Sequence, residues 1–143
     1  MVFADTSFLI SLYGQDVNTH AASQHVSVHS GPIHVTSVNE FEFANALRLL
    51  VFRGKITPAS RQAQMLAYKA DEKAGKVIFR STNSHDVFTK AESISASHTE
   101  AGGHRAYDIL QVAAALLLGA TEFWSFDGKQ RTLAQAEGLM VGP

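Results

Sequence analysis

Four acidic residues, far apart in the chain, stand where predicted strands end or predicted helices begin: Asp5, Glu42, Asp108 and Asp127. Carboxylates that a fold brings together repel one another, so they need protons or a cation between them. A cluster of oxygen ligands in a chain without cysteine favours Mg²⁺ or Mn²⁺ over zinc. Such an ion orients a water molecule and neutralises charge that develops on a phosphate during an in-line displacement. If the fold gathers these residues, the chemistry they predict is hydrolysis of a phosphodiester.

The sequence around the acids predicts the elements that would gather them. Asp5 follows the apolar run Val2–Ala4 and precedes a predicted helix, where an Asp is also an ordinary N-cap. Asp127 follows Thr121–Phe126, an aromatic-rich run that is typical of a strand. Each acid taken alone therefore has a structural explanation as a helix cap or a partner of the helix dipole. Asp108 opens a predicted helix whose apolar residues recur at core-facing spacings, namely Ile109, Val112, Ala113, Leu116 and Leu117.

Further strands and helices alternate along the rest of the chain. The other strands are predicted at Ile33–Ser37, Val77–Phe79 and Leu139–Val141. The other helices are predicted at Asn18–His29, about Val38–Gly54, Pro58–Ala74, Asn83–Ser97 and Lys129–Glu137. In the second of these, the residues predicted to face the core are Phe41, Ala44, Leu47, Leu50 and Val51. A loop is predicted at His98–Gly103. This alternation predicts one α/β domain over residues 1–143, with a doubly wound, mostly parallel sheet of about five short strands flanked by helices. Such sheets bind ligands outside the carboxyl ends of their strands, which is where the acids fall.

Composition agrees with one globular domain and narrows the function. With 143 residues, 45% of them hydrophobic and 17% charged, the chain is long enough to bury a core. A net charge of -1 excludes an overall basic field, so a nucleic-acid ligand requires locally clustered cations or a bound metal. The lack of cysteine excludes disulfides, and the first residues are typical neither of a signal peptide nor of a membrane span. We therefore expect a cytoplasmic protein that does not contact a membrane.

Other chemistries lack their motifs in this chain. The glycine-rich phosphate loops and the nucleophile elbow GxSxG are absent. A haloacid-type phosphotransferase would need a second acid where Ser7 stands, and a receiver domain would need its acceptor Asp where Arg80 and Ser81 end the third strand. His25 and His29 have a spacing that can bind a metal, but no third ligand is evident, so we interpret them as surface histidines.

The blocks ADTSFL, EFANAL, RAYDILQVAAALLLGA, FWSFD and KQRTLAQAEGL, in this order and spacing, resemble PIN domains, in particular the VapC-like toxins of type II toxin–antitoxin systems. The resemblance covers nearly the whole chain and implies a PIN-like three-layer domain that cuts RNA with Mg²⁺ or Mn²⁺. Asp5, Asp108 and Asp127 match the first, third and fourth acids and are the expected metal ligands. For the second acid, the register of EFANAL favours Glu42 over Glu40, whereas helical geometry does not decide between them.

The same resemblance implies residues that support the acids. Thr6, Ser7 and Ser125 match small hydroxyl positions, which would steady the ligands and a water molecule. Asn45 lies one turn after Glu42 and would join them.

Two positions depart from the family pattern, and three cations lie beside the acids in sequence. Gln111 stands where many relatives have a histidine, and His104 stands where some have a further acid, which leaves open whether one ion or two would bind. Arg105, Lys129 and Arg131 flank the acidic residues and could contact RNA phosphates. Solvated surface charge explains these cations equally well.

The resemblance also implies partners. VapC-like toxins form homodimers, cut RNA and are blocked by an antitoxin segment that lies across the acidic site. A structured RNA such as tRNA is the substrate that the resemblance favours, although nothing in the sequence chooses among tRNA, ribosomal RNA and mRNA. Phe41, Leu49, Val51 and Phe52 would line an exposed apolar groove for a partner, unless they belong to the core. Alternatives are a housekeeping PIN nuclease without an antitoxin, a catalytically silent binding module that keeps the fold, and a phosphatase or receiver-like domain.

Overall fold

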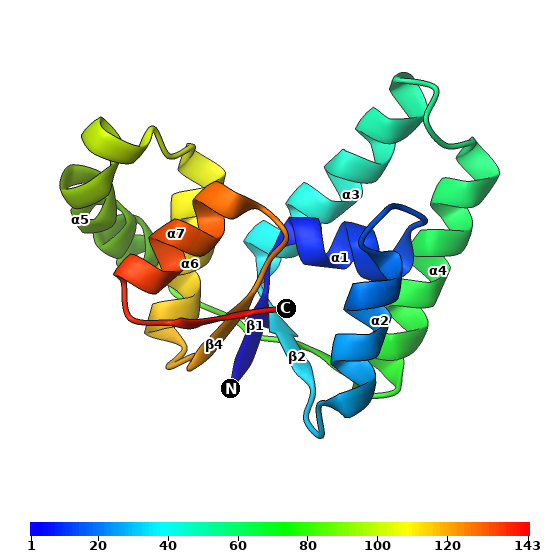
Figure 1. Cartoon of the computed structure of the whole chain (residues 1–143), viewed down its shortest axis with the longest axis horizontal. Coiled ribbons are helices and arrows are strands. Elements are labelled where there is room, and N and C mark those ends of the chain that lie inside the picture. Colours follow the sequence, from blue (N-terminus) through cyan, green and yellow to red (C-terminus); the bar gives the residue numbers. More distant parts are fainter.

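The computed structural model describes residues 1–143 and holds a single five-stranded sheet (Figure 1). Its strands are β1 (Val2–Ala4), β2 (Ile33–Val35), β3 (Val77–Phe79), β4 (Glu122–Trp124) and β5 (Met140–Gly142). They lie in the order β3-β2-β1-β4-β5, and every neighbouring pair is parallel. The predicted α/β class with about five short strands is confirmed, and the sheet is parallel throughout.

Seven helices surround this sheet: α1 (Thr6–Tyr13), α2 (Thr19–Val28), α3 (Ser37–Phe52), α4 (Pro58–Lys73), α5 (Ser84–Gly102), α6 (Ala106–Leu117) and α7 (Gly128–Ala136). Several begin where the sequence places a capping side chain. The side chains of Asp5, Thr57, Asn83 and Asp127 each accept a backbone hydrogen bond from the first turn of the helix that follows. Local capping chemistry therefore fixes where these four helices begin.

The predicted loop at His98–Gly103 is wrong, because α5 continues through it to Gly102. No residue between Ser97 and Gly102 interrupts the hydrogen-bond ladder of a helix. Gly103 then ends α5 in a left-handed conformation with φ 62°, and its backbone N–H donates to the carbonyl of Thr99 at 2.8 Å. The connection from α5 to α6 is consequently short.

Helices cover both faces of the sheet and give three layers (Figure 1). Helices α5, α6 and α7 pack on one face, over a core that includes Phe3, Val112 and Phe123. Helices α1 to α4 pack on the other face, over a core that includes Phe43 and Trp124. Successive strand residues point to opposite faces, so β1 and β4 supply both cores. The three-layer arrangement that the resemblance implied is confirmed.

Two predicted core-facing stripes are partly wrong. Helix α3 buries Asn39, Phe43 and Leu47, whereas Phe41 is 58% exposed. The aromatic ring of Phe43 packs against two tyrosine rings from α1 and α4, and this packing sets the rotation of α3 about its axis. Leu117 is 47% exposed because it is the last residue of α6, where the chain leaves the core.

The predicted surface histidines lie only half-exposed. The rings of His25 and His29 pack edge-on against Trp124, with centroid separations of 4.4 and 4.9 Å. This contact seats α2 on the end of β4, and it explains the spacing of four residues without a metal.

The order of the strands creates a switch point at the centre of the sheet. From β1 the chain moves outward to β2 and β3, and it then returns to place β4 and β5 on the other side of β1. Ala4 of β1 pairs with Trp124 of β4, and the backbone N–H of Asp5 donates to the carbonyl of Trp124 at 3.0 Å. In open α/β sheets such a switch point opens a crevice at the carboxyl ends of the strands. Asp5 and Asp127 both follow strands that end there.

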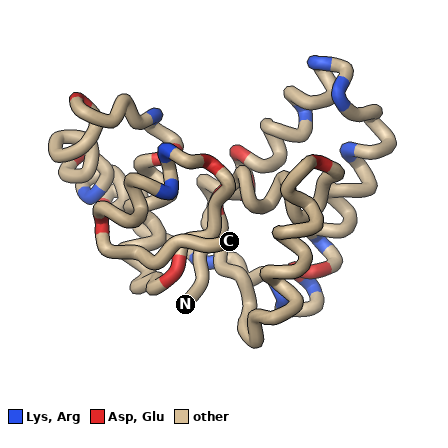
Figure 2. Tube along the Cα trace, viewed as in Figure 1, with Lys and Arg blue, Asp and Glu red and all other residues tan.

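Charged side chains are unevenly distributed over this fold. Figure 2 shows Lys and Arg gathered at the far end of the α3–α4 pair, where no Asp or Glu is drawn. The acids that concern the switch point lie at the opposite end of α3 and on the loops beside it (Figure 2).

Candidate active site at the carboxyl edge of the sheet

Asp5 is the most enclosed acid of the edge, with no exposed surface. Its Oδ1 caps α1 by accepting from the backbone N–H of Phe8 at 2.7 Å. The hydroxyl of Ser7 donates to both carboxylate oxygens at 2.8 and 2.9 Å, and the hydroxyl of Ser125 donates to Oδ2 at 2.7 Å. Burial raises the pKa of Asp5 to about 7 against the lowering effect of these bonds, and the charge of Asp127 raises it further. Asp5 is thus a fixed carboxylate in a place where a positive charge would be favoured.

Asp127 lies beside Asp5 and caps the next helix. Its Oδ1 accepts from the backbone N–H groups of Lys129 and Gln130 at 2.9 and 3.1 Å. Its own N–H donates to the hydroxyl of Ser125 at 2.9 Å, so the same serine contacts both acids. Ser125 therefore fixes the separation between the ends of β1 and β4.

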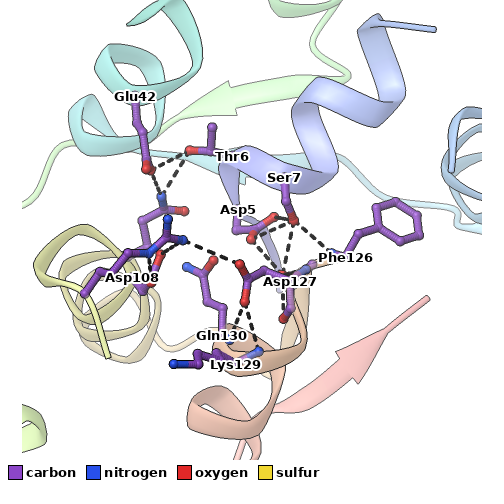
Figure 3. A network of polar contacts seen from close by, with 12 residues as sticks. Asp5, Thr6, Ser7, Glu42, Asp108, Phe126, Asp127, Lys129 and Gln130 are labelled. Atoms are coloured by element: carbon purple, nitrogen blue, oxygen red, sulfur yellow. Dashed lines mark hydrogen bonds and ion pairs between the residues drawn. The ribbon is translucent and has the colours of Figure 1, made fainter. Parts of the chain in front are cut away.

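Asp108 is the third acid, and an arginine joins it to Asp127 (Figure 3). The Asp108 side chain is 5% exposed and accepts two hydrogen bonds from Arg105, from Nε at 2.8 Å and from Nη2 at 3.1 Å. The same Nη2 lies 3.4 Å from Oδ2 of Asp127. Arg105 itself is 72% exposed, so its guanidinium covers the two acids from the solvent side. A single positive charge thus balances two carboxylates from different helices.

Glu42 reaches the edge from α3, whereas Glu40 does not. Oε2 of Glu42 accepts from the hydroxyl of Thr6 at 2.7 Å and from the side-chain amide of Gln111. Glu40 points to α4 instead, where its Oε1 accepts from the hydroxyl of Tyr68 at 3.1 Å and pairs with a lysine. Of the two glutamates, only Glu42 therefore faces the carboxyl edge, where Thr6 and Gln111 hold it.

Two buried amides at the edge were missed in the sequence. Asn39 donates from Nδ2 to the carbonyl of Ala4 at 2.9 Å and to Oε1 of Gln111 at 3.0 Å. Its own Oδ1 accepts from the backbone N–H and the hydroxyl of Thr36 at the start of α3. The spacing Thr-x-x-Asn is a capping-box signal that could have revealed Asn39. Gln111 was noted in the sequence only as a departure from the family pattern, and its polarity within an apolar helix was a second signal.

A third buried amide, Gln130, also lies at this edge. It is 3% exposed, and its Nε2 is buried without a hydrogen-bond partner. Figure 3 shows its side chain pointing from α7 toward the acids.

Two predicted neighbours of the acids have other surroundings. Asn45 is exposed on α3, and its side chain makes no hydrogen bond to Glu42 or to Thr6, so Asn39 and not Asn45 supports this part of the edge. Arg131 donates from Nη1 to the backbone carbonyls of Ser125 and Pro143 at 2.9 and 2.7 Å. The Lys129 side chain, by contrast, is exposed and forms no ion pair.

The donor set at the edge fits a hard cation in its chemistry. All four acids offer carboxylate oxygens, which are the ligands that Mg²⁺ and Mn²⁺ prefer. Burial is the main cause of the raised pKa of Asp5, and the nearby charge of Asp127 adds to it. Arg105 pairs with Asp108 and Asp127, so the edge carries negative charge that a cation balances. In the described arrangement no three His, Asp or Glu side chains are close enough to share one ion, and Arg105 pairs with Asp108 and Asp127.

Comparisons with known proteins agree with this architecture. Residues 2–136 match a family model described as PIN domain. No curated protein sequence matches the chain. Among solved structures, VapC20 of Mycobacterium tuberculosis, described as a sarcin-ricin loop cleaving toxin, superimposes with a TM-score of 0.72 at 20% identity over 100% of both chains.

Two further structures share the fold. FitAcB from Neisseria gonorrhoeae has a TM-score of 0.63 at 14% identity, over 100% of this chain and 97% of that chain. PAE2754 from Pyrobaculum aerophilum has a TM-score of 0.61 at 16% identity, over 98% and 87% of the two chains. No helix of the chain is both long enough and apolar enough to cross a membrane.

Proposed function

The chain belongs to the PIN domain family, and on this premise we propose that it is a Mg²⁺- or Mn²⁺-dependent endoribonuclease that acts as the toxin of a toxin–antitoxin pair. One observation carries the proposal: at the switch point of a parallel sheet, Arg105 pairs with both Asp108 and Asp127, Ser125 contacts both Asp127 and Asp5, and Glu42 reaches the same edge from α3. Neither helix capping nor core packing requires that all four acids converge.

Asp5, Asp108 and Asp127 would hold the ion, with Glu42 as the fourth acid. When bound, the ion supplies activation of a water molecule and neutralisation of charge on the phosphate. The hydroxyls of Ser7 and Ser125 would orient a metal ligand, because both donate hydrogen bonds to the Asp5 carboxylate and fix its orientation before any ligand binds.

Glu42 is the carboxylate best arranged to take a proton. Thr6 and Gln111 anchor its Oε2, whereas its Oε1 makes no hydrogen bond within the protein. We assign to Oε1 the proton of the attacking water, whose oxygen bonds to phosphorus as the bond from phosphorus to a bridging ribose oxygen breaks. Glu42 would thus act as general base, held at a fixed distance from the other three acids.

The cations beside the edge would position the RNA backbone. Lys129 forms no ion pair and is free to meet a phosphate. Arg105 and Arg131 flank the same edge, but Arg105 is paired with two acids and Arg131 is bound to two backbone carbonyls, so Lys129 is the main candidate. Such contacts orient a substrate without reading its sequence. They also explain how a chain of net charge -1 can accept a polyanion.

A cognate antitoxin and a second copy of the chain are the proposed partners. Support comes from the VapC-like fold and from exposed apolar side chains near the acids, since Phe41 and Leu49 on α3 are 58% and 40% exposed. A housekeeping PIN nuclease would share the chemistry but lack the antitoxin. A small antitoxin-like reading frame beside the gene would argue against that alternative.

Cleavage of total cellular RNA by the purified, metal-stripped protein tests the activity. The reaction is run with and without Mg²⁺ or Mn²⁺, beside Asp108→Asn, which removes one charge at nearly constant shape. We expect metal-dependent cutting by the wild type and none by the variant, and the fragment ends identify the RNA. Equal cutting by both proteins would show that Asp108 is not part of an active site.

A further inference from the structure

The α3–α4 hairpin carries positive charge that is not balanced locally. From Phe43 to Ala70 the chain contains no Asp or Glu. The same segment holds five of the 12 Lys and Arg residues: Arg48, Arg53, Lys55, Arg61 and Lys69. This segment is therefore strongly basic in a chain whose net charge is -1.

The structure gathers four of these cations at one place. Arg48 lies in the last turns of α3, Arg53 and Lys55 lie in the turn to α4, and Arg61 lies in the first turns of α4. None of the four forms an ion pair, whereas Lys69 farther along α4 pairs with Glu40 and Glu72. Together with Phe52 we call these four residues the basic tip (Figure 2).

An aromatic ring stands among these cations. Phe52 is 87% exposed at the end of α3, where its ring gains nothing from the core. Exposed aromatic rings beside Arg and Lys are the means by which proteins stack unpaired bases and hold the adjoining phosphates. An acidic protein segment is the competing occupant of such a surface, and the binding test below separates it from RNA.

Helix α3 joins the basic tip to the acidic edge along one exposed face. Phe41, Asn45, Arg48 and Phe52 are spaced four, three and four residues apart, and all are exposed. At the edge, the ring of Phe41 stacks on Tyr107, the neighbour of Asp108, with centroids 6.1 Å apart. The ten residues from Glu42 to Phe52 span about 15 Å along the helix. This face therefore offers a continuous track from the acids to the tip.

A hollow beside the tip contains a polar group without a partner. It has a volume of about 460 Å³ between α1, α3 and α4, and Arg53, Lys55 and Gln64 are among its lining residues. Gln64 is 8% exposed, and its Oε1 is buried without a hydrogen bond.

We propose that the basic tip is a second RNA-binding surface, which holds an unpaired segment of the substrate about 15 Å from the acids along α3. The inference rests on the proposed RNA substrate, but it concerns binding and not cleavage. It names single-stranded or loop RNA as the substrate class, because a base must be unstacked to lie on Phe52.

Fluorescence anisotropy in EDTA tests the surface without any cleavage. The probes are a stem–loop RNA and a fully paired RNA of the same length. The variants are Arg53→Ala with Lys55→Ala, and Phe52→Ala. The matched control is Lys73→Ala with Arg80→Ala, which removes two cations that form no ion pair and lie outside the tip. All altered side chains are exposed, so melting temperatures should stay unchanged.

We expect the double variant of the tip to bind both probes about tenfold more weakly, and the slope of log K against log salt to fall by about 1.4, as two lost phosphate contacts on a single strand predict. Phe52→Ala should weaken binding of the stem–loop by about fivefold or more and leave the paired RNA unchanged. The control should stay within about twofold of the wild type, because its cations lie away from the track.

The proposal would be overturned if the tip variants bound the stem–loop with the same affinity as the control variant. The proposal would also be overturned if the tip variants bound RNA like the wild type but no longer bound a co-expressed antitoxin, because the tip would then be a protein-docking surface. Cleavage of a dinucleotide separates the nuclease proposal from the proposal of a binding surface, because a dinucleotide is too short to reach the tip. We expect the tip variants to cut it at the same rate as the wild type. If the wild type cuts no RNA while the tip variants alone lose RNA binding, the nuclease proposal fails and the binding surface stands.

Discussion

Gln111 and Glu42 are joined by a hydrogen bond between α6 and α3, in which a neutral amide holds the second acid of the edge. The other end of the amide is also fixed, because Oε1 of Gln111 accepts from Asn39 at 3.0 Å. Asn39 in turn donates to the carbonyl of Ala4, the last residue of β1. The position of Glu42 is thereby coupled to the central strand that also carries Asp5.

Replacing Gln111 with Leu should destabilise the protein by about 2 kcal/mol, because Glu42 and Asn39 lose partners at a buried position. Urea unfolding at neutral pH measures the change in the free energy of unfolding. Gln135→Leu is the matched control, since Gln135 is exposed on α7. A difference below about 0.5 kcal/mol between the two variants would show that the amide does not support the edge.

Two of the acids could be predicted from local sequence because each one also has a local task. Asp5 and Asp127 cap α1 and α7, so the capping explanation and the site explanation hold for the same atoms. A parallel α/β order then requires that strand ends meet at one edge. Those two rules predict that Asp5 and Asp127 lie at one edge, whereas the choice of Glu42 over Glu40 required the family resemblance.

The supporting residues could not be predicted in the same way. Asn39 and Gln111 meet across α3 and α6 at a sequence separation of 72, and no periodic pattern encodes such a pair. Asn45 was predicted instead because it lies one turn from Glu42, but the packing of Phe43 turns that face of α3 to solvent. Tertiary packing decides the rotation of a helix about its axis. The wrong predictions for Phe41 and Asn45 both result from this rotation of α3.

Ionisation of the Asp5 carboxyl should lower the free energy of unfolding of the metal-free protein as the pH rises from about 4 to 7. Burial raises its pKa from 3.8 to about 7, so the folded state binds this proton more tightly than the unfolded chain does. Below pH 4 both states are protonated and no penalty remains. Above pH 7 both are ionised, and the full cost, on the order of 4 kcal/mol, persists.

Asp5→Asn removes this titration and therefore should stabilise the folded state at pH 8 while changing little at pH 4. The hydroxyls of Ser7 and Ser125 can rotate to accept from the new amide. Urea unfolding of both proteins in EDTA, from pH 4 to pH 8, measures the two curves. Parallel curves would show that Asp5 ionises normally in the folded protein.

We expect Lys129 to contact the substrate and Arg131 to stabilise the fold. Lys129→Ala should raise KM for RNA several-fold at unchanged kcat and melting temperature, because its side chain contacts no other charge. Arg131→Ala should lower stability by about 1–3 kcal/mol, since its guanidinium bonds the carbonyls of Ser125 and Pro143. Steady-state kinetics and thermal melts on the single variants test both statements. An unchanged KM for Lys129→Ala would end its assignment to RNA binding.

Arg105 pairs with Asp108 and Asp127, two of the proposed metal ligands, so its guanidinium and a metal ion should compete for these carboxylates. Removing its guanidinium leaves two acids without a counter-charge, and Arg105→Ala should therefore bind Mn²⁺ more tightly than the wild type does, by about fivefold if the ion pair contributes about 1 kcal/mol. Isothermal titration calorimetry measures the affinity without reference to activity. Lys129→Ala is the matched control, because it removes the same charge from a side chain that contacts neither acid. In the absence of metal, Arg105→Ala should melt at a lower temperature than the wild type, and saturating Mn²⁺ should stabilise it by a larger amount. If Arg105→Ala binds Mn²⁺ no better than Lys129→Ala, the guanidinium does not compete for the acids, and its contact with Asp108 serves only to fix the start of α6.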